Sequence, residues 1–438
     1  MQRREALRPH RANGAAGCGP AVKSLARRRH FRDSAAMQVT ANDIATAHRA
    51  IAPHIQRTPT IEAPRLGELF GLRLWLKLEN LQFTGSFKDR GSCLKLQRLA
   101  QSSSPPDGVV AASAGNHAQG VAYHARRLGM KAIIVMPLTT PFSKIERTEW
   151  LGAEVVLRGE SVAESTVHAK ELATTRDYVF VHPYDDPLVV AGQGTIAIEM
   201  LEDCPNLDTL VVPIGGGGLC AGIAVWAKHR KPDIKIYGVQ TSMCPSMRAQ
   251  IRGEPMPPLH THTLADGIAV KTPGVITAEI IKQLVDDILL VDEVDVETAV
   301  QVLAAQQKVV AEGAGAAGFA AVQRHSALFQ GREVGVVICG GNIDRRMLST
   351  VLLRGLKRDG KIAKLKIAIN DVPGVLARVT QMIGAAGADI IDIEHQRLFT
   401  GMSPRQAELD IVMETRGQAH VDRILAALRD VGFPAQSL

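Results

Sequence analysis

From about residue 72 onwards, short apolar runs alternate with longer stretches in which apolar residues recur at helical spacing. The stretch 117–128 is of the second kind, with its apolar face at Val121, Ala122, Ala125 and Leu128. Strands and helices that alternate on this scale form parallel sheets covered by helices. We therefore predict an α/β fold with two open, mostly parallel sheets. Its strands are expected at 72–78, 108–112, 132–136, 154–157, 178–182, 209–214, 235–239 and 333–338.

The alternation stops at residues 357–361, a charged stretch with one glycine that is typical of a linker. After it come strands at 364–369, 389–395 and 407–413, helices after Gly374 and at 419–430, and a short end with room for a last strand. The order βαββαβ is that of a ferredoxin-like module. We therefore predict one α/β region over 37–356, with a small subdomain at about 108–185 inserted in a larger one. A separate module is expected over 362–438.

Charge is distributed unevenly along the 438 residues, whose net charge is +7. Nine of the 51 Lys and Arg and two of the 44 Asp and Glu lie in residues 1–36, so the remainder is neutral with 42 of each. The basicity is therefore no evidence for a nucleic-acid or membrane partner. Residues 1–36 have three interpretations: a disordered tail, an upstream stretch before a true start at Met37, or an organellar transit peptide.

Cysteine usage and hydropathy limit the class of protein further. The six cysteines lie far apart without a CxxC pair, which argues against a zinc module or a disulfide scaffold and favours a reducing compartment, here the cytoplasm. The longest uncharged stretch, Leu210–Ala227, contains Pro213 and four consecutive glycines. A buried strand, a turn and a helix fit this stretch better than a membrane span.

Four segments carry candidate chemistry, and the first is Asn80–Gly91. Ser86 is a candidate helix cap, which would put Lys88 in the first turn of the following helix. The helix dipole disfavours a cation there, so the amine loses its proton more easily, as Schiff-base formation requires. On this segment alone, the alternative is an ordinary surface lysine.

The second segment, Ser113–Gly120, follows an apolar strand and opens a helix. Its small residues would let backbone N–H groups approach a bound carboxylate at the N-terminus of that helix. The alternative is a simple turn between strand and helix, with Asn116 as a local cap.

The third segment is the glycine run Gly215–Leu219, again between a strand and a helix. Only glycine lets a backbone wrap this closely around an anion with its N–H groups pointing inward, which favours a phosphate site over a flexible loop. A dinucleotide site is disfavoured, because Gln240 occupies the position near the end of the next strand where an acid would bind the ribose.

The fourth segment, Cys339–Asp344, also follows a strand. Taken alone, Cys339 is more simply a buried apolar residue. All four segments, however, lie at or beyond strand ends, which is where open α/β sheets place ligands.

Together these segments resemble the β-family, or fold type II, of pyridoxal-phosphate enzymes, and within it the threonine dehydratases. The motifs SerPheLysAspArgGly, SerAlaGlyAsnHisAlaGlnGly, GlyGlyGlyGlyLeu and GlyGlyAsnIleAsp occur in the family's order, and the resemblance spans about residues 40–438. It implies that pyridoxal 5'-phosphate is the cofactor and that residues 37–356 form the catalytic domain.

The resemblance also implies roles for individual residues. Lys88 would hold the cofactor as a Schiff base and act as the base at the substrate Cα. The ring would contact Phe87, Asn116 through its hydroxyl, Cys339 through its nitrogen, and Glu312 on the substrate side. Backbone N–H groups would bind the phosphate at Gly215, Gly216, Gly217, Gly218 and Leu219. The substrate carboxylate would lie at Ser113, Ala114, Gly115, Asn116 and His117.

Three departures from the wider family refine the expected chemistry. Related serine racemases carry a serine acid/base where this chain has Ala114, which favours elimination over racemisation. Their divalent-metal site uses a carboxylate where this chain has Gln240, so no metal is expected. Many relatives have Ser or Thr at Cys339, and a thiol is a weaker partner for the ring nitrogen. A weaker electron sink suits a rapid β-elimination.

The C-terminal module resembles an ACT domain, with Asp371, Pro373, Gly374 and Leu376 matching its first strand–helix turn. Such domains often bind an amino acid at a subunit interface, so we expect an amino-acid effector and a homodimer or homotetramer. Isoleucine or valine is the effector suggested by analogy.

The function implied is L-threonine ammonia-lyase activity, with some activity on L-serine, in amino-acid (isoleucine and threonine) metabolism. The alternatives are a dehydratase for serine or 3-hydroxyaspartate, a non-catalytic amino-acid sensor and, more weakly, a nicotinamide oxidoreductase.

Overall fold

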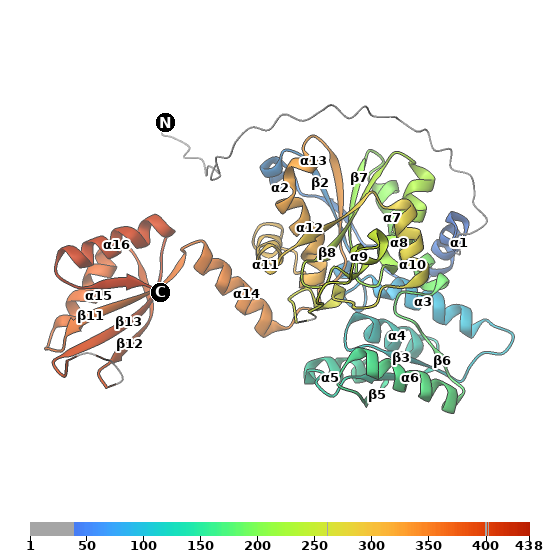
Figure 1. Ribbon diagram of the computed structural model, residues 1–438, viewed down its shortest axis with the longest axis horizontal. Coiled ribbons are helices and arrows are strands. Elements are labelled where there is room, and N and C mark those ends of the chain that lie inside the picture. Colours follow the sequence, from blue (N-terminus) through green and yellow to red (C-terminus); the bar gives the residue numbers. More distant parts are fainter. Residues whose placement is uncertain (1–38, 261, 399–400, 402) are drawn as a thin grey trace. The chain divides into compact units, whose positions relative to one another are not determined.

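The computed structural model describes residues 39–260, 262–398, 401 and 403–438 (Figure 1). The expectations for residues 1–36, and for Met37 as a start, lie outside the described residues. Within them, no helix has both the length and the apolar character needed to span a membrane.

The larger of two parallel sheets has six strands in the order β1-β2-β10-β7-β8-β9. All neighbours pair in parallel except β1, which runs antiparallel to β2 at the edge. All strands predicted for this sheet are present, whereas β1 and β9 were not predicted. The bounds are β1 Thr60–Glu62, β2 Arg73–Leu78, β7 Thr209–Pro213, β8 Lys235–Thr241, β9 Asp287–Val291 and β10 Glu333–Ile338.

The smaller sheet has four parallel strands in the order β5-β4-β3-β6. Side chains alternate between its faces: Val109 and Ala111 pack toward α4, while Val110 and Ala112 pack toward α6. A strand buried on both faces reads as a continuous apolar run, which is why these strands were recognisable. The bounds are β3 Gly108–Ala112, β4 Lys131–Met136, β5 Glu154–Leu157 and β6 Val179–Phe180, with α4 Asn116–Arg127, α5 Phe142–Trp150 and α6 Val162–Arg176.

Helices cover the six-stranded sheet, and the almost wholly buried α12 packs against β7, β8, β9 and β10. The first helix begins where Thr40 caps it, and Asp43 completes a capping box. The remaining helices of this region are α1 Ala41–Ile51, α2 Pro64–Phe70, α3 Lys88–Ala100, α7 Pro187–Asp203, α8 Gly218–Arg230, α9 Ser246–Arg252, α10 Val275–Leu284, α11 Glu293–Val302, α12 Gly313–Arg324, α13 Ser326–Phe329 and α14 Arg345–Arg358.

The C-terminal module has the predicted βαββαβ order, and its antiparallel sheet runs β12-β13-β11-β14. Along β11, buried Leu365 and Ile367 alternate with Lys364 and Lys366, so one face of the sheet forms a core with α15 and α16. Helix α14 continues through the first two residues of the segment expected as a linker. The bounds are β11 Ile362–Asn370, α15 Val375–Ala385, β12 Asp389–Gln396, β13 Gln406–Glu414, α16 Gln418–Asp430 and β14 Ala435–Ser437.

Candidate active site

Three of the four motifs follow three adjacent parallel strands of the six-stranded sheet. The lysine segment follows β2, the cysteine segment follows β10 and the glycine run follows β7. Because parallel strands end at the same edge, these segments lie together at the carboxyl edge of the sheet. Backbone hydrogen bonds join two of them: the Phe87 N–H donates to the Cys339 carbonyl (3.0 Å) and the Gly341 N–H to the Gly85 carbonyl (2.9 Å).

Lys88 is the first residue of α3, so its predicted place in the first helical turn is correct. The predicted cap is wrong, because Phe87 occupies the cap position and no side chain caps the helix. The hydroxyl of Ser86 is buried and has no hydrogen-bond partner in the described part of the chain. Pairing of Ser86 with Gly340 in an isolated bridge directs this residue to the neighbouring loop instead of the helix end.

The amine of Lys88 lies between a backbone carbonyl and an aromatic ring. Its Nζ donates to the Pro183 carbonyl (2.6 Å) and lies 5.1 Å from the centre of the Phe87 ring. Burial lowers the pKa of Lys88 to about 8, against a smaller opposing effect of Cys339. Desolvation disfavours the charged amine, so a neutral, nucleophilic amine is accessible near neutral pH.

A buried ion cluster lies beneath the first turn of α3, and sequence reasoning missed it. Arg90 donates through Nε and Nη2 to Glu79 (2.8 and 2.7 Å) and through both Nη atoms to Glu199 (2.6 and 2.8 Å). Lys77 donates to Glu199 (2.6 Å) and to the Thr58 carbonyl. Two cations and two carboxylates are thus paired, each at most 1% exposed. The cluster ties α3 to β2 and α7, two residues away from Lys88.

The glycine run forms a cradle of backbone N–H groups. Gly217 has φ of 100°, which L side chains rarely adopt, and it occupies the cap position of α8. A Cβ on Gly216 would overlap the ring of Tyr184. The N–H groups of Gly216 to Leu219 are buried and make no hydrogen bond to any described residue. Orphan donors at a helix N-terminus bind phosphate, so the cradle fits the phosphate of the expected cofactor.

The segment Ser113–His117 follows β3 in the smaller sheet, and Asn116 begins α4. The Gly115 N–H donates to the Ser113 hydroxyl (3.2 Å), whereas the N–H groups of Asn116 and His117 have no acceptor within the described residues. The imidazole of His117 contacts the Val181 carbonyl (3.0 Å), and burial lowers the pKa of His117 to about 3. Only the backbone of His117 is therefore available to a carboxylate.

The side chains of Asn116 and Glu312, distant in sequence, meet in this site. Asn116 Nδ2 donates to Glu312 Oε1 (2.6 Å), and Asn342 Nδ2 donates to Asn116 Oδ1 (2.7 Å). Glu312 occupies the cap position of α12 and is 8% exposed. Burial, reinforced by Asp266, raises the pKa of Glu312 to about 7, because both disfavour the charged carboxylate.

Cys339 is also buried, at 2% exposure, and its Sγ lies 3.4 Å from the Ala314 carbonyl oxygen. Burial raises the pKa of the Cys339 thiol well above its usual range, and Glu312 reinforces this shift. The thiol is therefore neutral.

The segment His182–Asp186 belongs to the site and was missed. It follows β6, adjacent to β3, and supplies the Pro183 carbonyl to Lys88 and the Tyr184 ring to the glycine run. Asp185 accepts hydrogen bonds from the Val275 and Ile276 N–H groups at the start of α10. The signal was present, because this segment also follows a strand end, but it carries no motif of its own.

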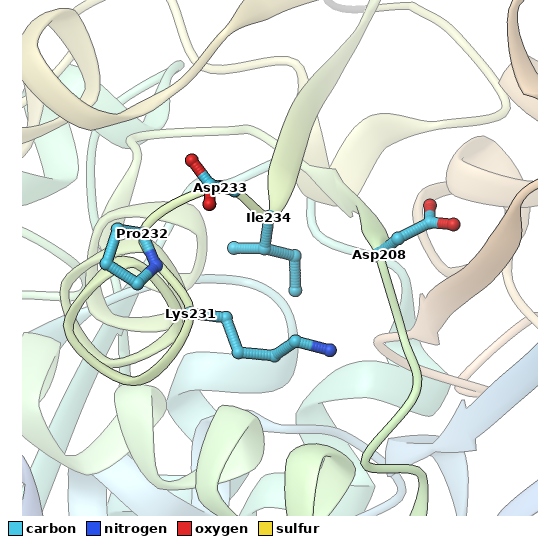
Figure 2. Close-up of a pocket in the computed structure, with 5 residues that line it drawn as sticks. All are labelled: Asp208, Lys231, Pro232, Asp233 and Ile234. Carbon is cyan, nitrogen blue, oxygen red and sulfur yellow. The ribbon is translucent and has the colours of Figure 1, made fainter. Parts of the chain in front are cut away.

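Elsewhere in the described residues, neither a surface pocket nor a cluster of metal-ligating side chains offers a second candidate site. A surface pocket of about 260 Å³ is lined by Asp208, Lys231, Pro232, Asp233 and Ile234, which Figure 2 draws as sticks. It lies at the amino ends of β7 and β8, opposite the motifs, and the Lys231 amine already donates to two backbone carbonyls. The described residues contain no group of three His, Cys, Asp or Glu side chains placed to hold a metal ion.

Comparison with known proteins shows the family of this chain. The family described as "Pyridoxal-phosphate dependent enzyme" matches residues 51–340, and the ACT domain family matches residues 365–433. The chain therefore belongs to the pyridoxal-phosphate dependent enzymes and carries a C-terminal ACT domain. A buried lysine amine and a cradle of backbone N–H groups are the kinds of group that fit this cofactor's aldehyde and phosphate.

Individual relatives are more specific. The chain is 41% identical over 403 residues to an L-threonine ammonia-lyase of Thermotoga maritima, covering 90% of this chain and 98% of the relative. It is 42% identical over 323 residues to a catabolic L-threonine dehydratase of Staphylococcus aureus, covering 73% and 93%.

Two solved structures are also similar. One is the processed form of threonine deaminase isoform 2 from Solanum lycopersicum, with a TM-score of 0.67 and 33% identity over 72% of this chain and 87% of that one. The other is a pyridoxal 5'-phosphate-dependent aspartate racemase, with a TM-score of 0.68 and 34% identity over 71% and 98%.

Proposed function

We propose that this chain is an L-threonine ammonia-lyase that also accepts L-serine. The observation that carries the proposal is the position of Lys88, whose desolvated amine lies at the same edge of the sheet as a set of backbone N–H donors with no acceptor among the described residues. The names of the relatives above support threonine as the substrate. The net reaction converts threonine to 2-oxobutanoate and ammonia, with loss of the Cα proton and of the β-hydroxyl.

Bound pyridoxal phosphate supplies the electron sink that makes the Cα proton acidic. In our proposal, backbone N–H groups of Gly215 to Leu219 would hold its phosphate and Lys88 would hold its aldehyde carbon. Phe87 and Cys339 would contact its ring.

The substrate is oriented by its carboxylate, which the free N–H groups in the segment 113–117 would bind at the start of α4. The Lys88 amine, when it is not bonded to the cofactor, would take the Cα proton. Its lowered pKa suits this role, because a general base is most effective when its pKa lies near the working pH. Ala114 offers no second acid or base, so elimination is favoured over racemisation.

The test is turnover of L-threonine, L-serine and 3-hydroxyaspartate by the purified protein, with keto acid, ammonia and D-amino acid measured separately. We expect threonine to give the highest kcat/KM and to yield keto acid without D-threonine. Lys88→Ala should lose all measurable turnover and the visible absorbance band of the lysine-bound cofactor. Persistent threonine turnover by Lys88→Ala would refute the proposed role of this residue, and D-threonine formation would refute the assignment to elimination.

Regulation belongs to the same proposal. Asp371 accepts from Arg397 Nε (2.8 Å), and Gly374, with φ of 87°, occupies the cap position of α15 in the turn where an ACT domain would bind an amino acid. We infer an amino-acid effector, with isoleucine or valine tried first, a homodimer or homotetramer, and a cytoplasmic location. Repeating the turnover assay with each branched-chain amino acid tests the effector.

A further inference from the structure

Asn342 lies in the loop after β10 and joins three separate segments of the site. Its Nδ2 donates to the backbone carbonyl of Thr84 (2.8 Å) and to Oδ1 of Asn116 (2.7 Å). Asn116 Nδ2 donates in turn to Glu312 Oε1 (2.6 Å). The result is one continuous chain of side-chain hydrogen bonds that begins one residue before Gly85 and ends at the start of α12.

The donor-to-acceptor direction of these hydrogen bonds is fixed at both ends of the series. The carbonyl of Thr84 can only accept, so Asn342 must present its NH2 group there. Its second hydrogen goes to Asn116 Oδ1 (2.7 Å), which lies nearer to Nδ2 than Gln119 Oε1 does (3.4 Å). Asn116 must then turn its oxygen toward Asn342 and its nitrogen toward Glu312, whose carboxylate also accepts. The orientation of an amide is inferred from its partners, and here the two ends give the same answer.

One hydrogen of Asn116 is left over. Glu312 is the acceptor of the other, and no second acceptor for Asn116 Nδ2 occurs in the described part of the chain. The remaining N–H is therefore available to a ligand. If the amide of Asn116 were reversed, its oxygen would face that ligand and the carboxylate of Glu312. Two hydrogen-bond acceptors would then face each other with no hydrogen between them.

Glu312 by itself would not hold this direction at every pH. Burial raises the pKa of Glu312 to about 7, and a protonated carboxyl can donate as well as accept. The carbonyl of Thr84 has no such second form. Asn342 therefore keeps the direction of these hydrogen bonds fixed even when Glu312 is neutral.

We propose that Asn342 is a positioning residue, which orients the amide of Asn116 so that an N–H and not the oxygen meets the ring oxygen of the cofactor. This inference rests on the proposed role of Asn116 in the proposed function. An N–H donor stabilises the ring oxygen in its deprotonated form, which keeps the lysine-bound cofactor in its longer-wavelength state.

The decisive variant is Asn342→Asp in the full-length holoenzyme. The new side chain has the same shape but, when ionised, has no hydrogen to donate, so it faces two acceptors and forces Asn116 to reverse or move. We expect the visible band of the bound cofactor to move to shorter wavelength. Cofactor binding to the apoprotein should weaken about tenfold, as expected when one charge-assisted hydrogen bond is lost.

Asn80→Asp is the matched control. Asn80 lies close to Gly341, the residue before Asn342, and its Nδ2 donates to the Val310 carbonyl (3.0 Å). It makes no hydrogen bond to Asn116, so the same loss of an amide should leave the band and the cofactor affinity as in the wild type.

A pH series separates orientation from packing. As the pH falls, the new carboxyl of Asn342→Asp takes a proton and can donate to Asn116 again, so its band should return toward that of Asn80→Asp. The other titratable groups near this region are Lys88 and Asp89 on α3, His117 on α4, Lys144 on α5, His182, Asp266 and Glu312. These groups are common to both variants, so their titration cancels in the comparison.

An unchanged band and affinity in Asn342→Asp would overturn the proposal, as would an equal change in Asn80→Asp. If Asn342→Asp does not accumulate as folded protein, Asn342→Ala removes the donors without adding charge and should shift the band in the same direction. Neither readout requires turnover. A protein that binds the cofactor but does not turn over threonine would therefore refute the proposed function, and the test of Asn342 would still be valid.

Discussion

The two sides of the candidate site are made from different parts of the polypeptide. On the glycine side, the consecutive backbone N–H groups of Gly216 to Leu219 belong to buried residues and have no acceptor among the described residues. On the lysine side, the donors are side chains, and a single hydrogen bond there joins residues 258 positions apart. One side is thus local in sequence and the other is assembled by the tertiary fold.

This difference predicts different sensitivities. A backbone cradle depends on the absence of side-chain volume, so it should be damaged by a single methyl group. The lysine side depends on the placement of α3, which the buried cluster of Arg90, Lys77, Glu79 and Glu199 ties to β2 and α7. It should therefore be damaged by a change that never touches the ligand.

The largest effect is expected from Arg90→Met. The substitution leaves two carboxylates with Lys77 alone at the centre of the cluster, and breaking a buried pair in this way costs about 3–5 kcal/mol. The thermal midpoint of the apoprotein should fall by roughly 5–10 °C, on the scaling for large domains. The cofactor band should weaken too, because Lys88 lies on the same helical turn.

Arg57→Met is the control for that prediction. Arg57 pairs with Glu202 and Asp203, but its side chain is 48% exposed. Exposed pairs contribute about 0–1 kcal/mol, so the midpoint should hardly move. Equal losses in the two variants would show that the burial of the cluster does not matter.

The backbone side is tested by Gly217→Ala. A Cβ there would lie 2.7 Å from the Met247 Cε and the Thr277 Oγ1, and overpacking of this kind costs about 1–3 kcal/mol. We expect cofactor affinity, measured by titration of the apoprotein, to fall roughly tenfold to hundredfold, since about 1.4 kcal/mol corresponds to a factor of ten.

Gly129→Ala isolates the effect of the cradle. Gly129 also has a positive φ of 67°, but a Cβ there meets nothing within 4 Å. Both variants therefore carry the strain of a left-handed residue, about 1–2 kcal/mol. Only Gly217→Ala should lose cofactor affinity, and matching losses would assign the effect to strain alone.

The same contrast explains what could be predicted from sequence. Strands buried on both faces, such as 108–112 and 209–213, are continuous apolar runs, and the glycine run is visible as four adjacent letters. β9 is also an apolar run, but it follows α10 after a two-residue gap without a glycine or proline to separate them, and β1 has only three residues.

The side-chain contacts of the lysine side were harder to predict from the sequence. Arg90 and Glu199 are 109 positions apart, each on a helix, and nothing local distinguishes a buried ion pair from two surface charges. Ser86 shows the opposite error: its type and position favour a cap, but pairing with Gly340 overrides that preference. Asn342 stood within a recognised motif, yet its role depends on Thr84 and Asn116, which only the fold brings to it.

The smallest effect is expected from Cys339→Ala, which asks whether every side chain on the lysine side matters. The thiol is neutral, because burial raises its pKa, and it is a weak hydrogen-bonding group, so the ring nitrogen loses little when it is removed. We expect kcat/KM on threonine to change by less than about threefold. Cys204→Ala, equally buried at 3% exposure but at the far end of α7, controls for the lost packing. A loss greater than about tenfold confined to Cys339→Ala would mean that the thiol bonds the ring directly. In that case the lysine side would act through each of its polar atoms and not chiefly through the amide chain of Asn342, Asn116 and Glu312.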